Sequence, residues 1–153
     1  MSDVKTVTKS VEQKFADRGI RLTRRRRQVL DVLMSADAAL SAYDIAELCN
    51  AGSESHMPTM SVYRILDLLQ EEQFIHRLET ANKYVSCSHI ACAHEHSGSQ
   101  FLICDGCRRV EEIQLSPEAV GAVEMAANAV GFASISPQLE VKGLCVDCQP
   151  ERI

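Results

Sequence analysis

The sequence predicts an α+β fold in two parts: a helical first half that ends in a strand hairpin, and a small mixed α/β second half. Three observations support this prediction. Apolar residues recur at helical spacing up to residue 69, β-like runs begin at residue 74, and two Cys-x-x-Cys pairs frame the second half. The chain has 153 residues, 46% of them hydrophobic, which suffices for one ordinary domain or two small ones.

The first two helices are predicted from their ends. Residues 9–18 form a short helix, and Gly19 is a usual helix-terminating residue. Thr23 then caps a second helix, whose apolar face includes Val29 and Leu33.

A third helix begins at Ser41, because Ser41 and Asp44 have the spacing of a capping box. The polar segment 50–58 predicts a loop, and residues 59–69 predict a fourth helix with a buried stripe. Two helices joined by such a loop form a helix-turn-helix, whose second helix reads the DNA major groove through its N-terminal residues. Those residues here are Ser61, Tyr63 and Arg64. An ordinary helical hairpin with a solvated face is the alternative.

The β-like runs 74–79 and 83–87 predict a hairpin after these helices. Such a hairpin is the wing of a winged helix-turn-helix, and we expect this domain to comprise residues 1–85.

The charge of the chain is unevenly distributed. The formal net charge is −5, but residues 1–83 carry as many basic as acidic residues, so the deficit lies in the second half. The run Arg24 to Arg27 stands at a helix N-terminus, where the helix dipole disfavours cations. This conflict favours contact with an external anion such as DNA phosphate, and Arg24 and Arg26 are the candidates. A solvated helix face is the alternative.

The paired cysteines predict a structural zinc site with Cys104, Cys107, Cys145 and Cys148 as ligands. Each Cys-x-x-Cys turn directs two sulfur atoms at one ion about 2.3 Å away, and four thiolates suit tetrahedral zinc. A redox centre or two disulfides are the alternatives. The first would need only one pair, and no secretory segment supports the second.

Between the cysteine pairs, the sequence predicts strands over 100–103, 110–114 and 135–141, with a helix from Ser116 to Gly131. Such a unit is small and leaves sheet edges open. Pairing with a second copy would cover them, so we expect residues 100–153 to be a dimerisation domain and the protein to be a homodimer.

Potential metal ligands crowd the predicted linker, residues 86–99, and its flanks. They are His76, Cys87, His89, His94, His96, Glu111 and Glu112. This density predicts a second metal site, and the Cys87 thiolate favours zinc over iron(II) or manganese(II). A zinc hydrolase or deaminase built on His94 and His96 is a distant alternative. The deaminase signature is absent, so we expect no enzyme.

Several motifs together resemble the ferric uptake regulator family of bacterial metal-responsive repressors. They are Arg21-Leu22-Thr23-Arg24, Ser41-Ala42-Tyr43-Asp44, Val62-Tyr63-Arg64 and the paired Cys-x-x-Cys motifs. The resemblance extends from about Phe15 to Cys148. It is strongest to the zinc uptake regulators, which end in Gly-Leu-Cys-x-x-Cys like residues 143–148. Relatives often have Pro where this chain has Arg24.

The resemblance implies a regulatory metal site made of His76, Cys87, His96 and Glu112, with His94 as the alternative to His96. It also implies two Zn²⁺ per subunit and DNA contacts by Tyr63 and Arg64. The expected protein is a cytoplasmic repressor that binds double-stranded operator DNA as a zinc-loaded dimer and controls zinc-uptake genes. A sensor of iron, manganese or peroxide from the same family is the alternative, and a thiol-redox protein is a distant one. No apolar run is long enough to span a membrane.

Overall fold

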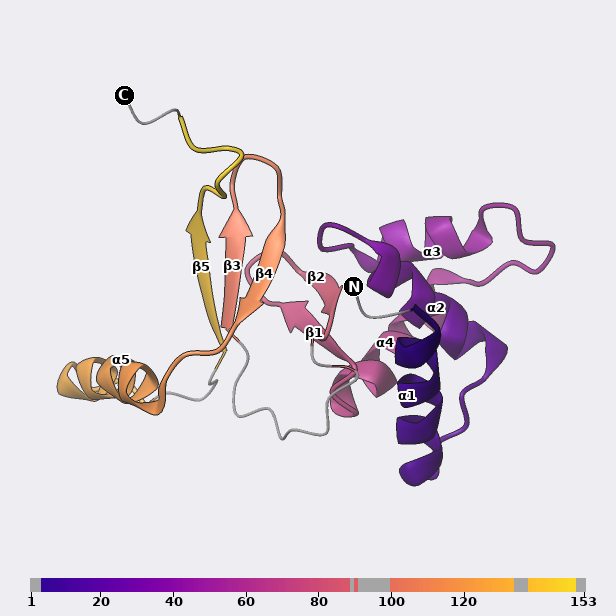
Figure 1. The fold of residues 1–153 in the computed structure, drawn as a ribbon, viewed down its shortest axis with the longest axis horizontal. Helices are drawn as coiled ribbons and strands as arrows, with labels where there is room; N and C mark the ends of the chain where they lie inside the picture. The colour runs from indigo at the N-terminus through magenta and orange to yellow at the C-terminus, as the bar shows by residue number, and fades with distance from the viewer. Residues whose placement is uncertain (1–3, 89, 91–99, 134–137, 151–153) are drawn as a thin grey trace. The chain divides into compact units, whose positions relative to one another are not determined.

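The computed structural model describes residues 4–88, 90, 100–133 and 138–150. These form two compact units, Met1–His94 and Glu95–Ile153, which are considered separately (Figure 1). The division falls within the predicted linker of residues 86–99, and the exact domain limits stay a prediction. Every helix in the described part of the chain is too short or too polar to cross a membrane.

The described residues of the first unit form four helices followed by two strands, as the sequence predicts. The elements are α1 (Val4–Asp17), α2 (Arg24–Ser35), α3 (Ala42–Asn50), α4 (Thr59–Glu71), β1 (Ile75–Leu78) and β2 (Lys83–Ser86). The α1 helix begins earlier than the predicted residue 9. Val4, Val7, Val11 and Phe15 continue the helical spacing of apolar residues toward the N-terminus, a pattern that the shorter prediction left out.

Side-chain caps define where these helices begin. Thr23 Oγ1 accepts a hydrogen bond from the Arg26 amide at 3.3 Å. The capping box of α3 is complete, because Ser41 Oγ accepts from the Asp44 amide and Asp44 Oδ2 accepts from the Ser41 amide, at 3.1 and 3.0 Å. Both predicted caps are therefore confirmed. In α4, the N-cap residue Pro58 offers no side-chain hydrogen bond.

The loop before α4 is fixed instead by Asn50, the last residue of α3. Its Nδ2 donates to the Met57 carbonyl at 2.9 Å, and its Oδ1 accepts from the Met57 amide at 2.6 Å. Met57 is itself buried. The two hydrogen bonds set the backbone immediately before the helix that is predicted to read DNA.

The hairpin packs on the helices through backbone pairing. Strands β1 and β2 are antiparallel, with His76 opposite Val85. Leu40 and Tyr84 exchange two backbone hydrogen bonds of 3.0 and 2.8 Å, which attach β2 to the segment between α2 and α3. The helices and this hairpin together form a winged helix-turn-helix.

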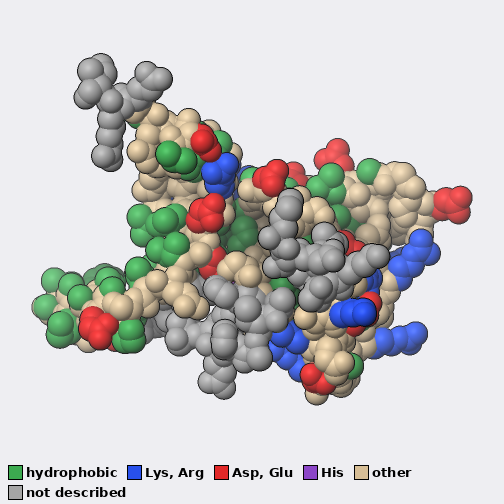
Figure 2. Space-filling model, in the orientation of Figure 1, with side chains coloured by type: hydrophobic (Ala, Val, Ile, Leu, Met, Phe, Trp, Pro, Cys, Tyr) green, Lys and Arg blue, Asp and Glu red, His purple; other side chains and the backbone are tan. Residues whose placement is uncertain are grey.

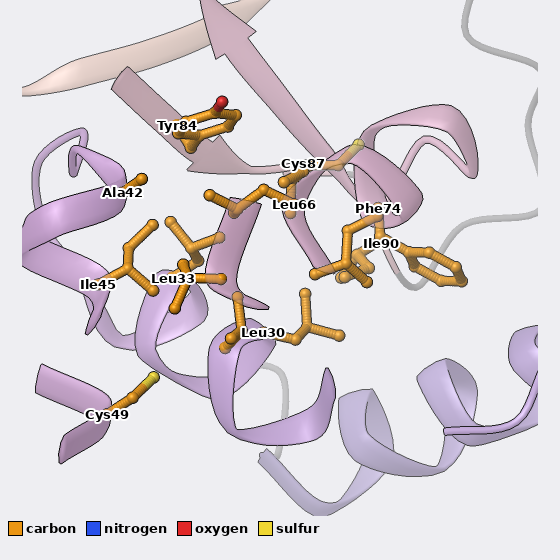
Figure 3. Close-up of a cluster of buried hydrophobic side chains, with 14 of the residues drawn as sticks. Leu30, Leu33, Ala42, Ile45, Cys49, Leu66, Phe74, Tyr84, Cys87 and Ile90 are labelled. Atoms are coloured by element: carbon orange, nitrogen blue, oxygen red, sulfur yellow. The ribbon is translucent and has the colours of Figure 1, made fainter. Parts of the chain in front are cut away.

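One hydrophobic core joins the helices and the hairpin (Figure 3). The Phe15 and Phe74 rings stack with centroids 4.4 Å apart, and Arg18 lies over the Phe74 ring at 5.1 Å. The thiols of Cys49 and Cys87 are both buried in this core, each with 2% exposure.

In the second unit, the residues that the structure describes form a three-stranded sheet and one helix. Its elements are β3 (Gln100–Cys104), β4 (Val110–Ile113), α5 (Pro117–Ala129) and β5 (Leu139–Gly143). The strand order is β4-β3-β5, in which β4 is antiparallel to β3 and β5 is parallel to it. The last strand was predicted over 135–141; residues 135–137 lie outside the described residues, and β5 ends at Gly143, beyond the predicted end. Buried Gln100 holds the first residue of β5, because its Oε1 accepts a hydrogen bond from the Leu139 amide at 2.7 Å.

Candidate metal centres and nucleic-acid interface

The four cysteines of the two Cys-x-x-Cys pairs meet at one end of the sheet. Strands β3 and β5 are parallel with Cys104 opposite Gly143, so both cysteine turns begin at adjacent strand ends. The sulfur atoms of Cys104, Cys107, Cys145 and Cys148 all lie within 4.8 Å of one another. Cys107 and Cys145 Sγ are 3.6 Å apart, too far for a disulfide. A zinc tetrahedron with bonds of about 2.3 Å has sulfur atoms about 3.8 Å apart, so the spacing fits the metal.

The thiols of this cluster differ in pKa. Hydrogen bonding from the Cys145 amide, and next from the Cys107 amide, lowers the pKa of Cys104 to about 6. Hydrogen bonding of the Cys148 thiol to the neighbouring sulfur atoms, Cys145 first, raises the pKa of Cys148 to about 12. Four thiolates at this spacing repel one another, and a divalent cation at their centre removes that repulsion. The donor set fits zinc in both geometry and chemistry.

Gly106 allows the two cysteine turns to approach. A Cβ atom at this position would lie 2.8 Å from Cys148 Sγ and 2.9 Å from Cys148 Cβ. Real Cβ atoms do not come this close to a neighbour, so any other residue would displace Cys148. The sequence shows Gly106 inside the pair, but not which distant residue requires it.

An ion pair also joins the two turns. Arg109 Nη1 lies 3.3 Å from Asp147 Oδ2, and Asp147 is part of the second cysteine pair. The negative charge of Cys145, followed by that of Asp147 and Cys107, raises the pKa of Arg109. Arg109 also lines a small cavity together with Cys104 and Cys145.

Two ligands of the predicted regulatory site lie together in the first unit. His76 is on β1 and Cys87 directly follows β2, and their ligand atoms are within 4.8 Å of each other. The Cys87 amide donates to the Phe74 carbonyl at 3.0 Å, which fixes the cysteine beside the hairpin. Figure 3 shows Cys87 at the edge of the core, near Leu66.

The remaining predicted ligands come from elsewhere in the chain. Glu112 is half-buried on β4 of the second unit, opposite Phe101, whereas its neighbour Glu111 is exposed opposite Leu102. Successive strand residues face opposite sides of a sheet, so Glu111 and Glu112 cannot serve the same site. His94 and His96 lie outside the described residues. The complete ligand set stays a prediction.

The residues predicted to contact DNA differ in their solvent exposure and in the hydrogen bonds that they already form. Arg64 on α4 is exposed, Ser61 is half-buried, and Tyr63 packs partly against the core. Arg24 on α2 is exposed, whereas the Arg26 guanidinium donates to the Arg21 carbonyl at 2.7 Å.

Arg27, a member of the same arginine run, pairs with Glu12 at 2.5 Å and holds α1 to α2. Figure 2 shows Lys and Arg side chains projecting from the helical unit. The DNA-binding roles of Arg24, Arg26, Ser61, Tyr63 and Arg64 stay predictions.

One exposed aromatic residue was not singled out from the sequence. Tyr43 is 69% exposed at the start of α3. The buried residues Ala42, Ile45 and Ala46 occupy the opposite side of that helix, and a helical wheel of the α3 sequence identifies Tyr43 as outward-facing.

Comparison with known proteins identifies the family to which this fold belongs. The model of the Ferric uptake regulator family matches residues 17–142. The chain belongs to the ferric uptake regulator family. It is 36% identical over 137 residues to the Zinc uptake regulation protein of Escherichia coli (strain K12), an alignment that covers 90% of this chain and 78% of that protein.

Solved structures of this family share the fold. A zinc uptake regulator complexed with zinc and DNA superposes with a TM-score of 0.80 at 32% identity, covering 97% of this chain and 95% of that one. The holo form of XcZur superposes with a TM-score of 0.74 at 34% identity, covering 92% and 94%. The predicted winged helix-turn-helix followed by a small α/β domain is thereby confirmed.

Proposed function

We propose that this protein is a zinc-responsive transcriptional repressor. It is a cytoplasmic protein that binds operator DNA as a zinc-loaded homodimer and controls zinc-uptake genes. The observation that carries the proposal is the buried Cys87 thiol with its ligand atom within 4.8 Å of that of His76, in a member of this family. A thiolate with an imidazole favours zinc, because iron(II) and manganese(II) prefer nitrogen and oxygen donors.

Each subunit holds two zinc ions in this proposal. One ion binds Cys104, Cys107, Cys145 and Cys148 permanently and stabilises the second unit. The other ion reports the zinc supply from His76, Cys87, His96 and Glu112, with His94 as the alternative to His96. A filled regulatory site selects the arrangement of the two DNA-binding domains that fits successive half-sites of the operator.

Exposed apolar residues support the homodimer. In the second unit, α5 buries none of its side chains, and Met125, Val130 and Phe132 are 70–75% exposed. Figure 2 shows hydrophobic side chains gathered over this helix. Strand β5 stands at an edge of the sheet, with Val141 53% exposed. An open strand edge and an exposed apolar helix are both surfaces that a second copy can cover.

On the operator, Arg64 and Ser61 act at the exposed start of α4, where Arg64 binds a guanine edge or a phosphate. Tyr63 contributes through its phenol, and Arg24 and Arg26 contact phosphate. The relatives described above are regulators of transcription, and we propose no catalytic activity for this chain.

The test is DNA binding at buffered free zinc. Affinity for a palindromic, AT-rich duplex is measured by fluorescence anisotropy across many decades of free zinc, with iron(II) and manganese(II) in parallel. Binding should switch on at low free zinc, and Cys87→Ala should abolish the switch while leaving the dimer intact. Cys49→Ala is the matched control, because Cys49 is an equally buried thiol of the same unit. A switch that follows iron(II) or manganese(II) would contradict the zinc assignment.

A further inference from the structure

Arg109 is connected to both cysteine turns. Its carbonyl accepts from the Cys104 amide at 2.9 Å, which closes the first turn. Its guanidinium reaches Asp147 in the second turn, with 3.3 Å between Nη1 and Oδ2. It also lines a small cavity of about 160 Å³ together with Cys104 and Cys145. The backbone and the side chain of one residue thus contact different halves of the cluster.

The cluster carries a net negative charge once it holds zinc. Four thiolates around one divalent ion carry a net charge of about −2. Arg109 is a cation that lines the same cavity as Cys104 and Cys145, and its guanidinium lies 3.3 Å from Asp147, inside the second cysteine pair. The preceding residue, Arg108, is exposed, and its side chain forms no hydrogen bond or ion pair with the described residues. Of these two adjacent arginines, Arg109 is the one that pairs with Asp147 of the second cysteine turn.

We propose that Arg109 is a positioning residue that retains zinc in the four-cysteine cluster by offsetting the negative charge of its thiolates. This inference rests on the proposed zinc site and adds a residue outside the ligand set. Asp147 supports this role of Arg109, because the ion pair orients the Arg109 guanidinium from the first cysteine turn toward the second. Groups that surround metal ligands commonly change metal affinity by about 10- to 100-fold when they are removed. The Arg109 side chain is 46% exposed, so the low end of this range applies.

Zinc release measures the effect directly. The full-length, zinc-loaded Cys87→Ala protein serves as the parent, so that the four-cysteine zinc alone is followed. A chromogenic chelator in excess records the release rate at constant pH. Arg109→Gln should release zinc about tenfold faster than the parent, and Arg109→Lys should recover most of the slow rate because it keeps the charge. Arg108→Gln is the matched control and should release zinc at the parental rate.

Two further measurements separate charge from packing. Asp147→Asn leaves the Arg109 charge in place and should accelerate release less than Arg109→Gln does. Raising the salt concentration should narrow the difference between Arg109→Gln and its parent, because salt screens exposed charges.

Several results would overturn the inference. Equal rates for Arg109→Gln and Arg108→Gln would do so, as would an Arg109→Lys rate as fast as that of Arg109→Gln. A parent protein without bound zinc would overturn the zinc assignment as well, which distinguishes the failure of the proposed function from the failure of this inference alone.

Discussion

The two candidate metal sites, the four-cysteine cluster and the site that includes His76 and Cys87, differ in where their ligands come from in the chain. All four sulfur atoms of the cluster come from one unit, at the ends of two hydrogen-bonded strands. The other site has two candidate ligands on one hairpin and needs further ligands from outside it. A site that is complete within one unit stabilises that unit whenever it is filled. A site that draws on separate segments links metal binding to their arrangement, as a sensor requires.

The largest effect should come from breaking the complete site. Cys104→Ser removes a buried ligand of the cluster, and we expect loss of its zinc, unfolding of the second unit and loss of the dimer. Structural zinc contributes about 10–16 kcal/mol of apparent binding free energy in small zinc domains. This free energy is larger than the free energy of unfolding of a small unit, so the unit should unfold when the zinc is lost. Zinc content and sedimentation velocity measure the change. Cys87→Ala should lose one zinc and stay dimeric, and a dimeric Cys104→Ser protein would contradict this prediction.

A smaller effect should distinguish the two adjacent glutamates of β4. Glu112→Gln should weaken zinc binding at the regulatory site by at least about tenfold, because loss of a group that merely supports a ligand already costs about 10- to 100-fold. Glu111→Gln is the matched control, since Glu111 faces the other side of the sheet. Competition with a zinc chelator gives both affinities. Equal affinities for the two variants would remove Glu112 from the ligand set.

Gly106→Ala tests the geometry of the cluster without changing a ligand. The added methyl group would meet Cys148, and we expect a loss of about 1–3 kcal/mol in the free energy of unfolding of the second unit. Far-UV circular dichroism during urea titration follows this unit together with the first. Gly143→Ala lies at the same end of the sheet, and a Cβ there meets nothing within 4 Å. It should match the unchanged protein.

The smallest effect concerns the first unit and depends on pH. Hydrogen bonding from the Ser41 amide, then from the Ser41 hydroxyl, lowers the pKa of Asp44. The charged form is therefore favoured in the folded protein. The capping contribution is present above the unfolded-state pKa of about 3.9 and is lost as the pH falls through the folded-state value.

Asp44→Ala should cost about 1 kcal/mol at pH 7, and the difference should shrink in acid. All three tyrosines lie in the first unit and the chain has no tryptophan, so tyrosine fluorescence follows its urea unfolding. Glu47→Ala, in the same helix, is the control. A cost of Asp44→Ala that is unchanged at low pH would show that the carboxylate charge contributes nothing.

Local patterns predicted much of this structure from the sequence. The caps at Thr23 and Ser41 and the turn at Cys104 depend on residues within a few positions of one another, so spacing alone reveals them. The contacts of Gly106 with Cys148 and of Arg109 with Asp147 join positions about forty residues apart. Their spacing has no helical or strand period, and only the parallel pairing of β3 with β5 brings them together.

From the parallel pairing of β3 with β5 we also expect the second unit to assemble slowly. The chain from Cys104 to Cys145 must return to the same end of the sheet, and closing a loop of this length costs about 3 kcal/mol of entropy before any contact compensates. Zinc that is first captured by Cys104 and Cys107 supplies a fixed point for the returning pair. We therefore expect refolding of this unit to accelerate with free zinc, so that the ion guides the order of folding before it stabilises the folded form.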